Sequence, residues 1–275
     1  MASSSPVRLI GVDCAAQHKR FGVALGELND HGVRVLAAST GHADVLPILR
    51  EWCEADPATP TVLAFDAPLG WPAPLGPALN DHAAGDPLPA DSNALFRRAT
   101  DDFVAATLGK RPLEVAADKI ARVAVRALRV LADLRTTLGR PLPLLWEPGS
   151  PPALTDEATG GGAIEVYPAA TLSARGLPLA GYKAKGAAKR PLARAARTAL
   201  LERLANEVRF EADRESLIAS DDALDAAVCV LAAADFARGA VARPPTDLPE
   251  ATLRREGWIW FGPPPTLAIV GSPTG

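Results

Sequence analysis

Short apolar runs separated by turn residues open the chain and predict that a sheet comes before most of the helices. Residues 8–13 are apolar on both faces up to their last position, which is typical of a strand in the middle of a covered sheet. Residues 21–28 and 33–39 flank a turn of Asn, Asp, His and Gly and predict an antiparallel hairpin. Residues 61–66 repeat the first pattern, and a proline two positions later prevents its continuation. The first 66 residues therefore predict four strands.

Helical spacing of apolar positions dominates the rest of the chain. It predicts helices at residues 43–55, 93–108, 114–138, 191–210 and 220–239. A fifth strand is expected at residues 163–167 and a half-buried edge strand at residues 257–261, with Trp258 and Trp260 on it. Residues 71–92 are rich in Pro, Gly, Asp and Asn and predict a long loop or lid, and residues 141–162 return to loop composition.

The order of these elements indicates the fold class. The predicted order is strand, hairpin, helix, strand, helices, strand and helix. This is the order of a ribonuclease H-like fold. We therefore predict one α/β domain over residues 1–275, with a mixed five-stranded sheet in the order 3-2-1-4-5 and helices on both faces. A helical insertion is expected at about residues 71–162, and the Pro- and Gly-rich tail at 262–275 is expected to be frayed.

Composition excludes several classes of protein. With 275 residues, 48% of them hydrophobic, the chain can bury a sizeable core. No run approaches the roughly 18 uncharged apolar residues of a membrane span, so we expect no membrane contact and a cytoplasmic location. The net charge of −3 argues against bulk nucleic-acid binding, so any such contact needs a local basic patch. Cys14, Cys53 and Cys229 lie far apart, which argues against a disulfide framework or a zinc site.

Seven short motifs are spread over nearly the whole chain. They are Gly11-Val-Asp13-Cys-Ala15, Asp66-Ala-Pro-Leu-Gly70, Arg97-Arg-Ala-Thr-Asp101, Glu165-Val-Tyr-Pro168, Tyr182-Lys183, Asp221-Asp-Ala-Leu-Asp225-Ala226 and Glu256-Gly-Trp258-Ile259. In number and order they resemble the motifs of domain of unknown function 429 (DUF429), a family of predicted RNase H-like nucleases. The resemblance implies a RuvC-like, metal-dependent nuclease core in which Asp13, Asp66 and the carboxylates of the last long helix hold a divalent metal. It also implies that Glu165 lies beside that metal.

The chemistry of the aspartates agrees with this implication. Asp13 and Asp66 end two strands that neighbour each other in the predicted sheet, and the helix at 220–239 begins with three further aspartates. Carboxylates that converge repel one another, and a hard divalent cation such as Mg²⁺ or Mn²⁺ makes such a cluster tolerable. Asp222 and Asp225 are three positions apart and can share one helix face, so we expect them as ligands with Asp13 and Asp66. Two metals bridged by Asp13 can activate water and stabilise a leaving oxygen.

Each of these aspartates also has a structural interpretation. Aspartates in a first helical turn cap the helix and complement its dipole, and we expect Asp221 in that role. Asp13 and Asp66 follow apolar strands and can simply begin loops. Glu165 either binds metal or positions water, or else forms a salt bridge with Arg97, Arg98 or Lys183.

Basic residues supply the candidate substrate-binding groups. Arg97 and Arg98 are expected to approach the scissile phosphate, with a surface ion pair between Arg97 and Asp101 as the alternative. Lys183 and Lys185 begin a basic segment that either contacts a phosphate backbone or forms a solvated helix face. Its members are Lys183, Lys185, Lys189, Arg190, Arg194 and Arg197.

The sequence therefore favours a divalent-metal-dependent nuclease, with Asp13, Asp66, Glu165, Asp222 and Asp225 as catalytic residues. A second hypothesis keeps the site but makes it a phosphohydrolase or phosphotransferase that acts on a nucleotide or a small phosphorylated metabolite. A third is a non-catalytic scaffold or regulatory module with the same fold. The substrate, the number of metals and the oligomeric state stay open at this stage.

Overall fold

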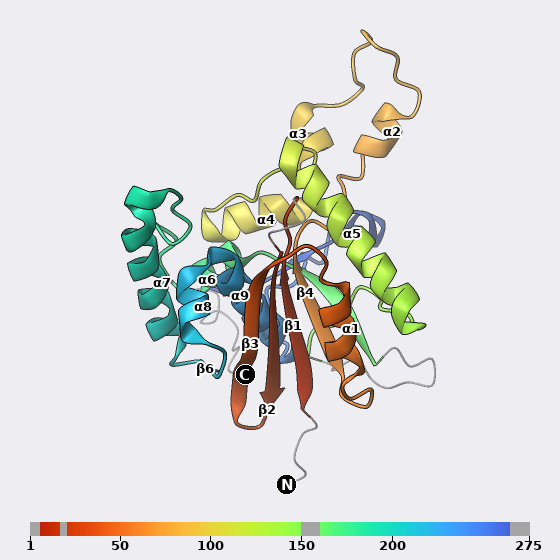
Figure 1. Cartoon of the computed structure of the whole chain (residues 1–275). Coiled ribbons are helices and arrows are strands. Elements are labelled where there is room, and N and C mark those ends of the chain that lie inside the picture. Colours follow the sequence, from red (N-terminus) through yellow and green to blue (C-terminus); the bar gives the residue numbers. More distant parts are fainter. Residues whose placement is uncertain (1–5, 17–20, 150–159, 265–275) are drawn as a thin grey trace, which may run out of the picture.

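The protein is a layered α/β structure with helices on both faces of a mixed sheet (Figure 1). A computed structural model describes residues 6–16, 21–149 and 160–264. Most of the tail expected to be frayed, residues 265–275, lies outside the described residues. Within the part of the chain that is described, no helix is long and apolar enough to cross a membrane.

Over the described residues the sheet has seven strands in the order β6-β3-β2-β1-β4-β5-β7. β2 pairs with β1 and with β3 in antiparallel orientation, and the other pairings between named strands are parallel. In chain order the strands are β1 (Val7–Asp13), β2 (Phe21–Asn29), β3 (Gly32–His42), β4 (Thr61–Asp66), β5 (Gly161–Val166), β6 (Val208–Phe210) and β7 (Ile259–Trp260). The middle five follow the predicted order. One further strand lies at each edge of the sheet, where β7 was expected and β6 was not.

The two extra strands have different origins. β7 lies where an edge strand was expected, although Trp258 and Trp260 are buried and not half-buried. Trp258 packs against Phe103 with ring centroids 5.0 Å apart, and Trp260 packs at the same distance against Phe236. β6 occupies the end of the helix predicted at 191–210, because the helix stops at Leu204 and the chain then pairs with β3.

Ten α-helices and one 3-10 turn are found within the described residues. They are α1 (Leu46–Glu54), α2 (Leu75–Leu79), α3 (Ser92–Phe96), α4 (Ala99–Leu108), α5 (Asp118–Leu138), α6 (Pro168–Ala174), η1 (Ala187–Lys189), α7 (Arg190–Leu204), α8 (Arg214–Ala219), α9 (Asp221–Ala237) and α10 (Glu250–Glu256). α1 and α5 pack on one face of the sheet, over Ile10, Val12, Leu63 and Phe65. α9 packs on the other face, against β1, β2, β3 and β4.

α9 lies unusually close to the strands it covers. Residues 223–236 of this helix are all buried, which its small apolar composition allows. A Cβ atom added to Gly11 would lie 2.0 Å from the backbone oxygen of Ala226, and one added to Gly22 would lie 2.1 Å from that of Asp222. Glycines on β1 and β2 therefore let the backbone of α9 rest on the sheet.

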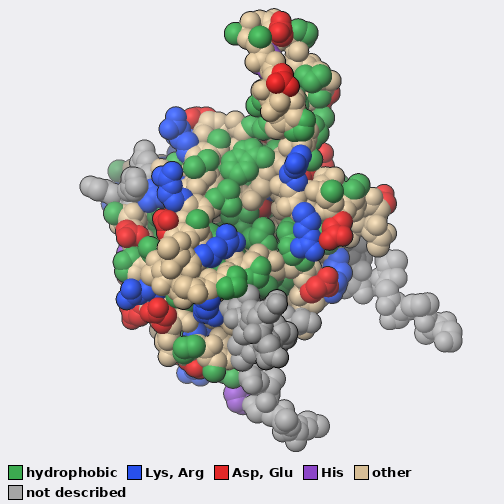
Figure 2. All heavy atoms as spheres, turned by 90° about the vertical axis from the view of Figure 1, so that its right-hand side faces the viewer, with side chains coloured by type: hydrophobic (Ala, Val, Ile, Leu, Met, Phe, Trp, Pro, Cys, Tyr) green, Lys and Arg blue, Asp and Glu red, His purple; other side chains and the backbone are tan. Residues whose placement is uncertain are grey.

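The segment between β4 and β5, where a helical insertion was expected, contains helices α2, α3, α4 and α5 within the described residues. The predicted loop at 71–92 contains the short helix α2, and the segment that bears α2 and α3 projects away from the sheet (Figures 1 and 2). The prediction of a single helix at 93–108 was wrong, because the chain is extended at Arg97 and Arg98 between α3 and α4. The backbone N–H of Arg98 donates to Asp101, which caps α4.

Candidate metal centre

Two neighbouring strands end with an aspartate at the same level of the sheet. Asp13 on β1 is paired in parallel register with Asp66 on β4. Side chains alternate between the two faces of a strand, and Leu9 on β1 and Ala64 on β4 lie in the core under α9. Asp13 follows Leu9, and Asp66 follows Ala64, by an even number of positions, so each aspartate points to the same face as that core residue. Both carboxylates therefore face the start of α9.

The first turns of α9 bring a third carboxylate to the same place. Ser220 is the N-cap, and its hydroxyl accepts a hydrogen bond from the backbone N–H of Ala223, so the cap is Ser220 and not Asp221 as expected. Asp225 lies one turn further along and is 2% exposed. One carboxylate oxygen from each of Asp13, Asp66 and Asp225 lies within 4.8 Å of the others.

Burial and mutual repulsion make these three carboxyl groups hard to ionise together. Burial raises the pKa of Asp13 well above its ordinary value, and the charges of Asp225 and Asp66 raise it further. Burial also raises the pKa of Asp66 to about 7, with Lys183 opposing the shift and Asp225 adding to it. The pKa of Asp225 is raised by burial in the same way. A cation between the three would remove this penalty, and an all-carboxylate set suits Mg²⁺ or Mn²⁺ better than a softer metal.

Two residues from the segment after α6 hold Asp225. The Lys183 ammonium lies 2.5 Å from Oδ2 of Asp225, and the Tyr182 hydroxyl donates to Oδ1 at 3.1 Å. Although burial opposes it, the charge of Asp225 raises the pKa of Lys183, which therefore stays protonated. Tyr182 was not selected from the sequence as a site residue, although it stands beside Lys183 in one of the seven motifs.

The other aspartates of the α9 tip lie outside the group of three. Asp222 is half-buried, and its charge contributes to the raised pKa of Asp13, so it is near the centre without belonging to the group. Asp221 forms an ion pair with Lys185. Of the four metal ligands predicted from the sequence, the structure brings Asp13, Asp66 and Asp225 together.

Glu165 is the centre of a different, buried network. Its two carboxylate oxygens accept from Nη1 and Nη2 of Arg98 at 2.9 and 2.7 Å, and Oε2 also accepts from the backbone N–H of Leu69. Arg98 is 1% exposed and donates as well to both oxygens of Asp101 and to the backbone oxygen of Glu256. All five N–H groups of its guanidinium are therefore engaged, so none is left for a phosphate.

Several of the remaining basic candidates pair with other parts of the chain. Arg97 pairs with Glu114, and not with Asp101. Arg197 is buried and donates to the backbone oxygens of Tyr182 and Ile218 at 2.5 and 2.6 Å. Arg194 pairs with Glu215 on the surface. Of the basic segment, only Lys183 reaches the three carboxylates.

A cavity of about 310 Å³ opens beside the carboxylates. Asp13, Asp66 and Lys183 form its polar end. Its apolar walls come from the insertion and from β5 and the residue after it, and include Leu113, Ile120, Val123, Val166 and Tyr167. The site therefore combines a negatively charged floor with an apolar pocket next to it, as small-molecule and substrate sites commonly do.

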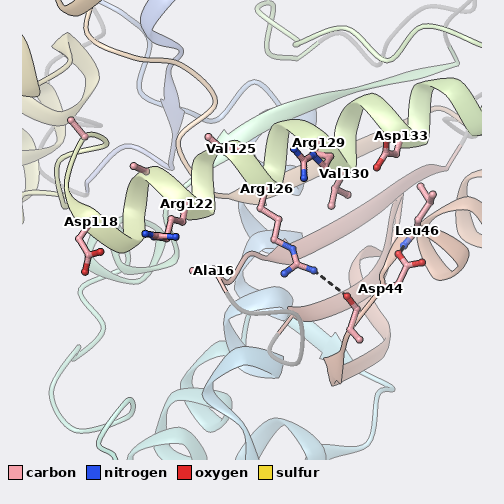
Figure 3. Close-up of a pocket in the computed structure, with 13 residues that line it drawn as sticks. Ala16, Asp44, Leu46, Asp118, Arg122, Val125, Arg126, Arg129, Val130 and Asp133 are labelled. Atoms are coloured by element: carbon pink, nitrogen blue, oxygen red, sulfur yellow. Dashed lines mark hydrogen bonds between the residues drawn. The ribbon is translucent and has the colours of Figure 1, made fainter.

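A larger groove of about 850 Å³ runs along α5 (Figure 3). Arg122, Arg126 and Arg129 project from the helix into it, and Nη2 of Arg126 donates to the backbone oxygen of Ala43 at 3.0 Å. The Arg126 guanidinium also lies 4.4 Å from the centre of the Phe21 ring. Three aspartates line the same groove, so its formal charges balance; they are Asp44, Asp118 and Asp133. These arginines were not selected from the sequence because their spacing on an amphipathic helix is that of an ordinary solvated face.

Comparisons with known proteins give one result. No curated protein and no solved structure matches the chain. The profile of one family, described as "Protein of unknown function (DUF429)", matches residues 11–250. This range includes Asp13, Asp66, Glu165, Lys183 and Asp225. The match covers most of the chain, and the protein therefore belongs to the DUF429 family.

Proposed function

We propose that the protein is a divalent-metal-dependent phosphodiester hydrolase that acts on nucleic acid. The observation that supports this proposal is the convergence of Asp13, Asp66 and Asp225 at the ends of two strands and the start of a helix. All three belong to rigid elements, which favours a pre-organised site. In this proposal they hold Mg²⁺ or Mn²⁺, the metals that prefer such oxygen ligands.

The residues around the three carboxylates fit that chemistry. A bound divalent ion supplies positive charge at a phosphate and activates water. Tyr182 and Lys183 fix the orientation of Asp225, and the Lys183 ammonium faces the cavity where a phosphate would lie. The apolar walls of the cavity lower the local dielectric constant, which strengthens each of these electrostatic interactions.

The fold and the composition give further support. The central strands follow the order 3-2-1-4-5 with α9 across them, as expected for a ribonuclease H-like nuclease. Cys14, Cys53 and Cys229 are all free, which suits the reducing cytoplasm that we propose as the location.

A second candidate function keeps the site and changes the substrate. The cavity of about 310 Å³ is near the lower limit of ordinary ligand pockets, and a nucleotide or a small phosphorylated metabolite would fit one of that size. A metal-dependent phosphohydrolase or phosphotransferase is therefore the alternative. A scaffold without catalysis is the remaining possibility, in which Lys183 alone neutralises Asp225.

One set of assays separates these functions. Purified protein is incubated with Mg²⁺ or Mn²⁺ and with single-stranded, duplex, hybrid and branched substrates, alongside a panel of nucleotides and phosphoesters. We expect cleavage of a nucleic acid that needs the metal and is abolished by Asp13→Asn. Asp86→Asn is the matched control, because Asp86 is exposed in the insertion and makes the same change of charge.

The outcomes distinguish the three candidates. Turnover of small phosphoesters alone would replace the nuclease by the second function. Calorimetry that detects no binding of Mg²⁺ or Mn²⁺ would favour the scaffold. Micromolar binding that is lost in Asp66→Asn would exclude the scaffold even if no substrate in the panel were cleaved.

A further inference from the structure

The ion pair between Lys183 and Asp225 has a bearing on how many metal ions the centre can take. The sequence leaves this number open and is compatible with two ions bridged by Asp13. In the structure, a lysine ammonium already lies against one side of the carboxylate cluster. We propose that the centre takes one divalent cation and that Lys183 supplies the positive charge that a second ion would otherwise bring. This inference rests on the proposed metal site.

The supply of ligands favours one ion. Three carboxylates converge closely enough to share a cation. Glu165, which a second ion would need, gives both of its oxygens to Arg98. Asp222 lies outside the group of three. Within the described residues these three form the one group of carboxylates close enough to hold a metal, so a second ion would have to share ligands with the first.

The contacts that Asp225 already makes also favour one ion. A carboxylate has about four lone-pair positions for hydrogen bonds or metals. Oδ1 of Asp225 already accepts from Tyr182, and Oδ2 forms a close ion pair with the Lys183 ammonium at 2.5 Å. Asp225 can still bind one cation, but the place of a second is taken by the ammonium.

The formal charges also balance with one ion. Three ionised carboxylates carry three negative charges, and Lys183 reduces the total to two, which one divalent cation neutralises. The Lys183 side chain is about half exposed, and its ammonium contacts a carboxylate that is 2% exposed. Lys183 also lines the cavity beside Asp13 and Asp66, where a substrate phosphate would meet it.

The number of bound ions tests this proposal without any measurement of activity. Wild-type protein, Lys183→Met and Lys185→Met are titrated with Mn²⁺ by calorimetry, and the Mn²⁺ paramagnetic resonance spectrum reports whether ions lie in coupled pairs. We expect one isolated Mn²⁺ per chain in the wild type and a second, coupled Mn²⁺ in Lys183→Met. Lys185→Met is the matched control, because Lys185 pairs with Asp221 outside the group of three, and it should bind one ion.

Each other result overturns a stated part of the proposal. Two coupled ions in the wild type would refute the one-ion centre and leave the metal-dependent function intact. One ion in Lys183→Met, with unchanged affinity, would refute the role of Lys183. No ion in the wild type or in either variant would refute the metal centre, and the proposed function with it. If Lys183→Met does not fold, Lys183→Gln replaces it, and the wild-type stoichiometry still decides the first point.

Discussion

Gly11 is the position where the packing of α9 and the geometry of the proposed metal centre can be perturbed together. It lies on β1 two residues before Asp13, and the backbone of α9 passes directly over it. A Cβ atom at this position would lie 2.0 Å from the backbone oxygen of Ala226 and 2.9 Å from Cβ of Cys229. We therefore predict that Gly11→Ala separates α9 from β1 and weakens metal binding.

The size of the effect follows from these distances. Contacts of a real Cβ atom are essentially never shorter than 3.0 Å, so α9 or β1 must move by about 1 Å. Overpacking of this kind costs about 1–3 kcal/mol of unfolding free energy, which lowers the Tm of a chain of this size by about 2–12 °C. Asp225 neighbours Ala226 and moves with it, whereas metal ligands tolerate errors of only about 0.2 Å. We expect the affinity for Mn²⁺ to fall by about tenfold or more.

Thermal unfolding with and without Mn²⁺, together with Mn²⁺ calorimetry, measures both effects. Gly76→Ala is the matched control, because Gly76 lies in α2 with no atom within 4 Å of its added Cβ, so the same methyl group should not destabilise the protein. If Gly11→Ala melts like the wild type and binds Mn²⁺ with the same affinity, then close packing of α9 does not position Asp225, and our explanation of the centre is wrong.

Two further predictions concern the charged groups. Burial raises the pKa of Asp66 to about 7. The folded metal-free protein therefore keeps a proton on Asp66 that the unfolded chain releases above about pH 4. The stability that this bound proton contributes is lost as the pH rises towards 7. In EDTA, Asp66→Asn should therefore raise Tm relative to the wild type by more at pH 7.5 than at pH 4.5; an equal or opposite difference would contradict the shift. Arg98→Ala should lower the free energy of unfolding in urea by about 3–5 kcal/mol, because it removes the cation that pairs with the buried Glu165 and Asp101. Arg97→Ala should cost about 1 kcal/mol or less, because its ion pair is at the surface.

The two strands that end in Asp13 and Asp66 and the acidic start of α9 were predictable from local sequence. Apolar runs that end in a carboxylate at Asp13 and Asp66 indicated the two strand ends, and the order of elements placed these strands side by side. The small apolar composition of α9 likewise indicated a helix buried against the sheet with an acidic start. Each strand end and the helix start depend on residues close together in the sequence, which is where periodicity is informative, whereas their adjacency followed from the order of the elements.

Features that depend on distant partners were not predictable. Val208, Arg209 and Phe210 are too few to show an alternating pattern, and they form β6 only because β3 offers an open edge. The break between α3 and α4 is stabilised by the bonds of Arg98 to Glu165, which is 67 positions away. The role of Arg98 was missed for the same reason, since a buried arginine and a phosphate-binding arginine have the same local sequence.

The insertion between β4 and β5 influences the charge of the metal centre as well as its shape. Glu165 is the register partner of Phe65, directly before Asp66, and its charge is among those that raise the pKa of Asp66. Without a partner, Glu165 would add a fourth carboxylate to the cluster and favour a second cation. Arg98, which the insertion contributes, neutralises Glu165 and occupies both of its oxygens. Two basic residues from different segments, Arg98 and Lys183, thus contact Glu165 and Asp225, and the charges of the two further carboxylates, Asp13 and Asp66, match one divalent ion.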